Sequence, residues 1–246
     1  MEQRIFVDET IEDLQAGGLR LIQKKDGFRF GTDAILLADF AKGIAAQEIL
    51  DLCTGTGIVP MLLSHKTSAA HIFGLEIQAG ICSMAQRSVA LNNLVGRIEI
   101  TEGDLKDAAL KYGKRRFDMV TCNPPYMEAG AGLQNLTDTK LIARHEILCT
   151  LEDVVQVSAD LLKQGGHLVM VHRPRRLGEL FWIMRNYRIE PKRLRLVYPS
   201  LDKEPVLCLI DGTFCGGAEL RILPPLFLKG QDGCESEELK KIYGRG

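Results

Sequence analysis

The sequence predicts an α/β fold in which a mostly parallel β-sheet is covered by helices on both faces. From about residue 48 onwards, short apolar segments alternate with longer segments of helical character, and this alternation is typical of parallel sheets. A glycine-rich turn joins the first apolar segment to the first helix. Acidic residues lie at the ends of three successive apolar segments, which predicts a cluster of polar groups at one edge of the sheet.

The segment before this alternation is short. Residues 19–23 alternate weakly and predict an N-terminal strand, while Lys24–Gly27 is interpreted as a hairpin turn because Asp-Gly favours positive φ. Residues 34–40 follow as an apolar helix. We therefore expect residues 1–45 to form an N-terminal extension whose hairpin and helix cap a ligand site.

Residues 46–230 are expected to form the main domain. Its predicted parallel strands are residues 49–53, 72–76, 98–101, 117–122 and 167–171. Its predicted helices are residues 58–65, 81–94, 151–162 and 177–187, and Gly165-Gly166 is expected to break the third of them. Residues 193–198, 206–210 and 219–223 are expected to complete the sheet as an antiparallel edge. The tail, residues 231–246, is polar and predicts a short helix that frays.

Composition excludes several classes of protein. The 246 residues, 46% of them hydrophobic, suffice for one substantial core. A net charge of −1 rules out a uniformly basic nucleic-acid binder, so any such surface needs local clustering. Seven widely spaced cysteines without a C-x-x-C pair predict neither a disulfide framework nor a metal site. The sequence has no signal peptide pattern and no apolar stretch near the ~20 residues that span a bilayer, so we expect a cytoplasmic protein without membrane contact.

The glycine-rich turn is Asp51-Leu52-Cys53-Thr54-Gly55-Thr56-Gly57. Glycines there permit a tight turn and a close approach of the backbone to a ligand, although such a turn can also bind nothing. The G-x-G-x-x-G pattern of dinucleotide-binding folds is absent, because Pro60 replaces its last glycine. Glu76 ends the second strand, where an acid can bind ribose hydroxyls, and Asp104 follows the third, where it can accept a hydrogen bond from an adenine amino group.

The tetrapeptide Asn123-Pro124-Pro125-Tyr126 follows the fourth strand. As a structural element it is a stiff loop, because two prolines fix φ and cannot extend a central strand. The tetrapeptide can also hold an amine. The side-chain oxygen of Asn123 and the carbonyl oxygen of Pro124 can each accept a hydrogen bond from one N–H, which directs the nitrogen lone pair at an electrophile. Tyr126 can stack on a base, which contributes ~1–3 kcal/mol. With the glycine turn, the tetrapeptide predicts methylation of an amine or amide nitrogen.

These residues resemble those of class I S-adenosylmethionine-dependent methyltransferases of the amino-methylating type. Residues 23–34, 142–146, 173–177 and 191–195 further resemble the bacterial tRNA1(Val) adenine N6-methyltransferase family, and the resemblance spans about residues 15–226. It implies a Rossmann-like, doubly wound sheet of seven mostly parallel strands and S-adenosylmethionine as cofactor. It also implies that the substrate is a tRNA, with the adenine beside the anticodon of a valine tRNA as the methylated base.

The resemblance also implies roles for single residues. Asp51, Gly55 and Gly57 would contact the methionine part of the cofactor, with residues 30–33 closing over it, while Glu76 would hold the ribose and Asp104 the adenine. The expected catalytic residues are Asn123, Pro124, Pro125 and Tyr126. The expected cofactor-binding residues are Phe30, Gly31, Thr32, Asp33, Asp51, Cys53, Thr54, Gly55, Gly57, Glu76, Ile77, Gly103, Asp104 and Asn123.

Basic residues suggest where a nucleic acid binds. Residues 172–195 contain eight Lys or Arg against two Glu. With Lys24, Lys25, Arg29 and Arg144 they can contact a phosphate backbone, although they can equally form a solvated face. The expected substrate-binding residues are Tyr126, Arg144, Arg173, Arg175, Arg176, Lys192 and Arg193. No metal is expected, and the chain is expected to act as a monomer or a weak homodimer.

Other functions stay open at this stage. The same tetrapeptide occurs in enzymes that methylate a glutamine amide of a translation factor, but these carry a sizeable helical domain before the glycine turn, and only about fifty residues precede it here. Methylation of an adenine in another RNA is a second alternative. A catalytically inactive binding module would have no need of Asn123, and the glycine spacing disfavours a nucleotide-dependent dehydrogenase.

Overall fold

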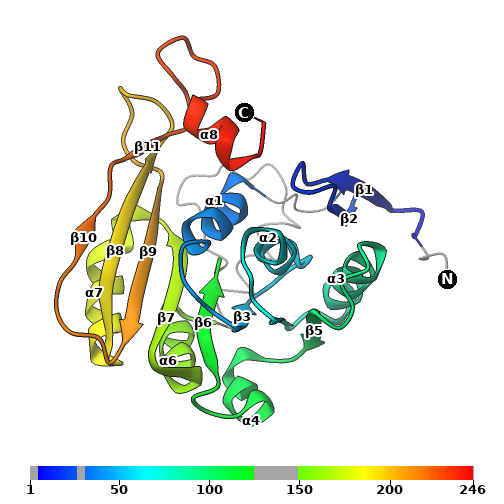
Figure 1. Ribbon diagram of the computed structural model, residues 1–246, viewed down its shortest axis with the longest axis horizontal. Coiled ribbons are helices and arrows are strands. Elements are labelled where there is room, and N and C mark those ends of the chain that lie inside the picture. Colours follow the sequence, from blue (N-terminus) through cyan, green and yellow to red (C-terminus); the bar gives the residue numbers. More distant parts are fainter. Residues whose placement is uncertain (1–4, 27–30, 125–148, 246) are drawn as a thin grey trace.

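A mostly parallel sheet runs through the centre of the computed structural model, which describes residues 5–26, 31–124 and 149–245 (Figure 1). Its long strands are β3 (Glu48–Leu52), β4 (His71–Glu76), β5 (Ile98–Glu102), β6 (Phe117–Cys122), β7 (Leu162–His172), β8 (Ile189–Tyr198) and β9 (Leu207–Phe214). Two strands of two residues each, β10 (Arg221–Ile222) and β11 (Leu226–Phe227), pair with β8. The described residues thus contain the seven expected long strands in a sheet of nine.

The strand order is β10-β8-β9-β7-β6-β3-β4-β5. Strands β7, β6, β3, β4 and β5 are parallel to one another, and β9 is antiparallel to both β7 and β8. The expectation that residues 219–223 form an antiparallel edge was wrong, because β10 and β11 run parallel to β8. Both edges of β9 are already paired, and β9 ends beside the start of β8, where Phe214 pairs with Ile189. The chain that follows pairs with the free edge of β8 and, because it starts beside Ile189, it runs in the same direction as β8.

Helices cover the two faces of this sheet and create two hydrophobic cores (Figure 1). One core contains α1 (Thr32–Ala41), α2 (Ile58–Lys66), α3 (Ala79–Leu91) and α8 (Glu237–Ile242). The other contains α4 (Ala108–Tyr112), α6 (Leu151–Leu161) and α7 (Leu177–Asn186). The long helices match the sequence-based prediction to within a few residues. Residues 108–112 were not predicted as a helix, because five residues are too few for the apolar period to repeat.

The N-terminal extension contains a hairpin, but its turn lies elsewhere than expected. Strand β2 (Arg20–Lys24) pairs with β1 (Glu9–Asp13), a strand that the sequence reading missed. The connection between the two strands contains Gly17 and Gly18, both at positive φ. Lys25 and Asp26 do form a turn after β2, but this turn does not join the two strands, and Gly27 lies outside the described residues. An ion pair of 2.6 Å between the largely buried Glu9 and Arg87 fastens the hairpin to α3.

Gly165 and Gly166 do not break a helix, as the sequence suggested, but lie inside β7. Helix α6 ends at Leu161, and the register between β6 and β7 shifts between Phe117 and Met119. A Cβ on Gly166 would come within 3.1 Å of the carbonyl oxygen of Asp118. The glycine is therefore required by the close approach of two strands at this irregularity.

The C-terminal helix α8 forms as expected but packs against the body of the protein. Leu239 and Ile242 are buried, and Lys66 donates a hydrogen bond of 2.9 Å from Nζ to the carbonyl oxygen of Ile242. These contacts argue against the predicted fraying. In the described ranges, no helix combines the length and the apolar character needed to cross a membrane.

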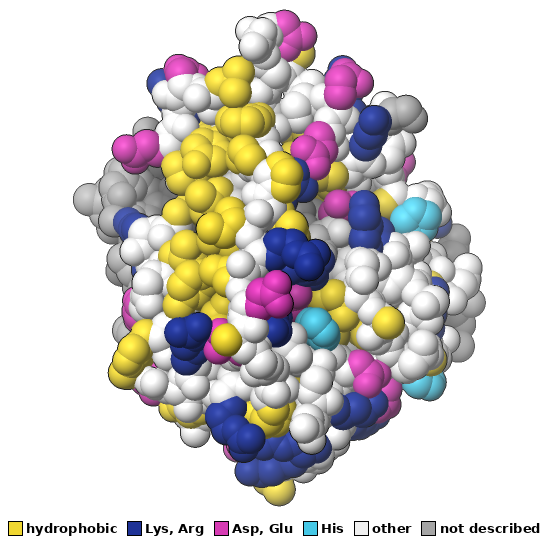
Figure 2. Space-filling view, turned by 60° about the vertical axis from the view of Figure 1, so that its left-hand side comes forward, with side chains coloured by type: hydrophobic (Ala, Val, Ile, Leu, Met, Phe, Trp, Pro, Cys, Tyr) yellow, Lys and Arg dark blue, Asp and Glu magenta, His cyan; other side chains and the backbone are white. Residues whose placement is uncertain are grey.

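Figure 2 shows the face formed by the left-hand side of Figure 1, where β8, β10 and β11 lie. A band of hydrophobic side chains runs along it, with lysines and arginines in separate groups beside the band (Figure 2). Leu201, Leu220 and Ile222 of this part of the chain are exposed. This face therefore does not present the continuous basic surface that a nucleic acid prefers.

Candidate functional site

The carboxyl ends of β3, β4 and β6 bring together the polar residues that the sequence singled out. Asp51 is buried in β3, and the hydroxyl of Thr121 in β6 donates a hydrogen bond of 2.6 Å to its Oδ1. Burial raises the pKa of Asp51 to about 7, although the hydrogen bond from Thr121 opposes the shift. A carboxylate in this position gains from a nearby positive charge, so the site is suited to a cationic ligand.

The glycine turn is held by the acid of the next strand. The backbone N–H groups of Gly55 and Gln78 each donate a hydrogen bond of 2.9 Å to the buried carboxylate of Glu76, one to each oxygen. Gly55 and Gly57 adopt positive φ angles of 56° and 82°. A Cβ on Gly57 would lie only 3.2 Å from the Cβ of Ala85, whereas one on Gly55 would meet nothing within 4 Å. Gly57 thus lets α2 and α3 pack closely, while Gly55 borders open space in which a ligand can lie.

Asn123 faces the N-terminus of α1. Its Nδ2 donates a hydrogen bond of 3.0 Å to Oδ2 of Asp33, although the two residues are 90 positions apart in the chain. Oδ1 of Asp33 accepts a second bond of 2.9 Å from the backbone N–H of Ala34. Because a carboxylate only accepts hydrogen bonds, the amide must present its NH₂ group to Asp33. Oδ1 of Asn123, the oxygen that the sequence-based mechanism requires, is therefore turned away from Asp33.

The remaining expected cofactor residues lie along the same edge. The backbone N–H of Thr54 donates to Leu75 and that of Gly103 donates to Glu76, each at 3.0 Å. Asp104 caps a short 3-10 helix, Leu105–Asp107, by accepting a bond of 2.9 Å from the backbone N–H of Lys106. Gly31 precedes α1, which begins at Thr32, and Ile77 directly follows β4. Asp104 thus has a structural role that leaves its second carboxylate oxygen for another partner.

Four expected site residues, Phe30, Pro125, Tyr126 and Arg144, lie outside the described residues. Pro124, the last described residue of the tetrapeptide, is buried.

The sequence predicted Cys53 at this edge but not the two further thiols beside it. The thiols of Cys122 and Cys149 both lie close enough to Cys53 to affect its pKa. For Cys53 the neighbouring thiol of Cys122 raises the pKa most, with burial adding to it, and for Cys122 burial itself is the main cause. The three residues are far apart in the sequence, and no spacing pattern links them. Both Cys53 and Cys122 are therefore protonated at neutral pH.

The expected substrate-binding arginines divide into two groups. Arg173, Arg175 and Arg176 follow the carboxyl end of β7, on the edge of the sheet that carries Asn123, because Met170 pairs with Cys122. Arg176 forms an ion pair of 2.6 Å with Glu179. Lys192 and Arg193 lie elsewhere, in β8.

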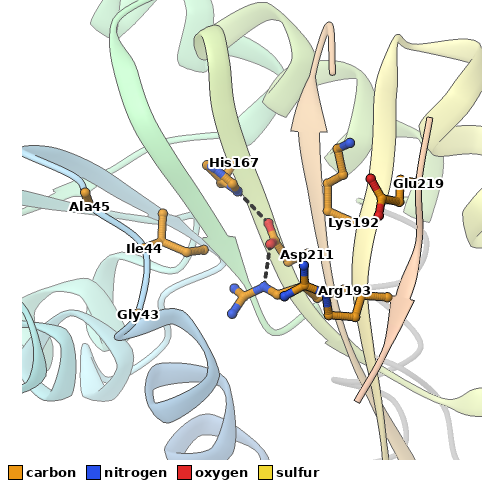
Figure 3. A pocket seen from close by; sticks show the side chains of 9 residues that line it. Gly43, Ile44, Ala45, His167, Lys192, Arg193, Asp211 and Glu219 are labelled. Carbon is orange, nitrogen blue, oxygen red and sulfur yellow. Dashed lines mark hydrogen bonds and ion pairs between the residues drawn. The ribbon is translucent and has the colours of Figure 1, made fainter. Parts of the chain in front are cut away.

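Figure 3 shows the cavity around Lys192 and Arg193. It measures about 500 Å³ and is lined in part by Gly43, which follows the C-terminal end of α1, whereas Asp33 is at the N-terminal end. The buried Asp211 accepts a hydrogen bond of 2.8 Å from Nε of Arg193 and lies 2.7 Å from Nδ1 of His167 (Figure 3). The ten residues of α1, about 15 Å of helix, thus separate this cavity from the residues around Asn123.

Comparison with known proteins assigns the family. The methyltransferase small domain family matches residues 24–180. The chain belongs to this family. A tRNA1(Val) (adenine(37)-N6)-methyltransferase of Porphyromonas gingivalis is 32% identical over 72% of this chain and 71% of its own length. The protein of the same name from Parabacteroides distasonis is 30% identical over 76% of this chain and 77% of its own.

Solved structures show the same fold. A predicted O-methyltransferase from Agrobacterium tumefaciens has a TM-score of 0.69 and 23% identity, and covers 87% of this chain and 97% of its own. A 16S rRNA N2 G1207 methyltransferase of Thermus thermophilus has a TM-score of 0.57 and 17% identity, and covers 83% of this chain and 50% of its own. The expected class I, Rossmann-like fold is therefore confirmed.

The chain is accordingly an S-adenosylmethionine-dependent methyltransferase. The residues at the sheet edge fit this cofactor, which carries positive charges on its sulfonium and ammonium groups. Asp33, Asp51 and Glu76 supply three carboxylates along this edge, and Gly55, which donates to Glu76, borders open space. A cofactor without phosphate also explains why the third glycine of a dinucleotide-binding turn is replaced by Pro60.

Proposed function

We propose that this enzyme transfers a methyl group to N6 of an adenine in tRNA, and that the adenine beside the anticodon of a valine tRNA is its substrate. The observation that carries the proposal is the hydrogen bond of 3.0 Å between Asp33 and Nδ2 of Asn123. This bond fixes which way the carboxamide faces and leaves its oxygen to accept an amine hydrogen. The names of the two relatives support the choice of base and of RNA.

The reaction requires more positioning than acid–base chemistry. The lone pair of an adenine amino group is delocalised into the ring, so the nitrogen is a poor nucleophile. Oδ1 of Asn123 and the carbonyl oxygen of Pro124 each accept a hydrogen bond from one of its two N–H groups. This favours a tetrahedral nitrogen and frees the lone pair. Bound S-adenosylmethionine supplies the electrophilic methyl group. Asn123 and Pro124 would hold the nitrogen towards this group, and the methylated nitrogen would release one proton to solvent.

For the cofactor we propose that Asp51 and the turn at Gly55 and Gly57 hold the methionine part, with residues 30–33 closing over it. Glu76 binds the ribose, and Asp104 binds the adenine through its remaining oxygen.

The substrate base must leave any stack to reach this site, and we propose that Tyr126 stacks on it. Arg173, Arg175 and Arg176 lie on the same edge as Asn123 and are suited to bind the RNA backbone there. Lys192 and Arg193 are less suited, because the length of α1 lies between them and Asp33. With a tRNA substrate, we propose that the enzyme acts in the cytoplasm. In this proposal residues 46–230 are the catalytic domain, residues 1–45 cap its cofactor site, and residues 231–246 are a tail.

The experiment that tests the proposal is methyl transfer from labelled cofactor to tRNA transcripts without modifications, followed by nucleoside mass spectrometry. We expect N6-methyladenosine in a valine tRNA and none when guanine replaces the adenine beside the anticodon. Label in another RNA would retain the reaction but reject the substrate. Label found only in protein would favour the glutamine amide alternative and reject the proposal.

A further inference from the structure

Gln23 in β2 is a buried polar side chain without an internal partner. It is 1% exposed, and neither its Oε1 nor its Nε2 has a hydrogen-bond partner among the residues that the structure describes. Leaving such a group unsatisfied destabilises the folded protein, because each buried donor or acceptor has lost its hydrogen bonds to water. The neighbouring Ile22 shows the usual arrangement, since its backbone N–H donates to Oγ of Ser88 at 3.0 Å. An amide with both of its polar atoms unpaired points to a ligand.

The course of β2 leads towards the cofactor edge. Arg20 pairs with Asn92, which follows the last residue of α3, and Ile22 pairs with Ser88, one turn earlier in that helix. Strand β2 therefore runs towards the N-terminus of α3. That end of the helix follows the carboxyl end of β4, where Glu76 lies.

The face of β2 that carries Gln23 is also defined. Side chains alternate along a strand, so Gln23 and Leu21 share one face. Leu21 packs in the core that α1, α2, α3 and α8 share. Two of these helices, α1 and α2, have their N-termini at the proposed site, with Asp33 in the first turn of α1 and Gly57 directly before α2. The amide of Gln23 is thus placed on the side of the hairpin that faces the region where we place the methionine part of the cofactor.

We propose that Gln23 binds the amino-acid end of S-adenosylmethionine. A carboxamide offers an acceptor and a donor side by side, and the amino-acid end of the cofactor offers the complementary pair: the ammonium group donates to Oε1 and the carboxylate accepts from Nε2. Asp51 and Asp33 add the negative charge that the ammonium and sulfonium groups need. The inference rests on the cofactor and is independent of which RNA or protein is methylated.

The test compares two ligands that differ only in the part that Gln23 would bind. S-adenosylhomocysteine keeps the amino-acid end, whereas 5′-methylthioadenosine lacks it. Isothermal titration measures both affinities for the wild type and for Gln23→Leu, which has a similar size but no polar atoms. The matched control is Gln86→Leu, because Gln86 donates an ordinary hydrogen bond of 2.8 Å to the carbonyl oxygen of Ile100.

We expect Gln23→Leu to bind S-adenosylhomocysteine at least tenfold more weakly and 5′-methylthioadenosine within twofold of wild type. Without ligand its melting temperature should be equal or higher, because an unsatisfied amide has been removed. Unchanged affinity for S-adenosylhomocysteine, or an equal loss for both ligands, would overturn the proposal. So would a clear fall in the ligand-free melting temperature, because it would show that the amide is satisfied within the protein. Gln23→Met serves as the second variant if Gln23→Leu does not fold.

Discussion

Replacing Asp51 by asparagine should stabilise the ligand-free enzyme while weakening cofactor binding. Asp51 is 2% exposed, and burial raises its pKa from 3.8 to about 7. A raised pKa means that the folded protein binds this proton more tightly than the unfolded chain does. The stability contribution of the protonated group is therefore complete below pH 3.8 and is lost as the pH rises to about 7.

The size of the effect follows from this shift. The rise in pKa lowers the free energy of unfolding of the wild type by about 4 kcal/mol at pH 8. At pH 5 the loss is less than half of that, because aspartate is ionised in the unfolded chain but Asp51 is protonated in the folded protein. Asparagine keeps the oxygen that accepts the bond of 2.6 Å from Thr121 and carries no charge. For a chain of this size, recovering all of the stability that is lost at pH 8 would raise the melting temperature by about 10 °C.

Thermal melting of wild type and Asp51→Asn without ligand, at pH 5 and pH 8, measures the effect. The variant should gain more at pH 8 than at pH 5, and titration should show at least tenfold weaker binding of S-adenosylmethionine. Glu9→Gln is a control of opposite sign, because the hydrogen bond from Arg87 lowers the pKa of Glu9, so this variant should lose stability at pH 8. An equal gain at both pH values, or a variant less stable than wild type at pH 8, would refute the reasoning.

Three further predictions concern the cofactor turn, the tail and the thiols. Glu76→Ala removes the acceptor of two backbone N–H groups and should weaken cofactor binding at least tenfold, and unchanged affinity in titration would reject this cofactor map. Leu239→Ala should lower the free energy of unfolding by about 2–3 kcal/mol in urea melts, because Leu239 is buried; a change below 0.5 kcal/mol would mean that α8 is not docked. Cys122 should react with iodoacetamide far more slowly than the exposed Cys234 at pH 7.5, and equal rates would contradict its raised pKa.

The sequence predicted the parallel part of the sheet well, because its strands are short apolar segments that are punctuated by glycines and acids. It failed where non-local contacts decide the structure. Strand β1 has an alternating burial pattern with few apolar residues and is held in place by the ion pair between Glu9 and Arg87, which no local pattern reveals. The direction of β10 depends on which edge of the sheet is free, and this follows from the pairing of β8 with β9.

The same distinction holds for the site. The positions of Asp51, Glu76 and Asn123 at this edge of the sheet were predictable, because each lies at or next to the carboxyl end of a recognisable strand. Asp33 was expected from the family resemblance, but its hydrogen bond to Asn123 joins segments 90 positions apart and became visible only in the structure. Thr121 carried a weak signal as a polar residue inside an apolar strand, and it holds the carboxylate of Asp51. The sequence could not show that Arg173 and Arg193 lie in different parts of the fold, because both belong to the same basic segment.

The most direct test of the account is single-turnover methyl transfer by Asn123→Ala, with the affinity for S-adenosylmethionine measured on the same preparation. If the carboxamide oxygen of Asn123 positions the amine, the rate should fall by at least about 10²–10³, as expected when a preorganised hydrogen-bonding group is lost, while the cofactor affinity stays within about threefold. A rate near that of the wild type, with the cofactor bound normally, would contradict the central claim.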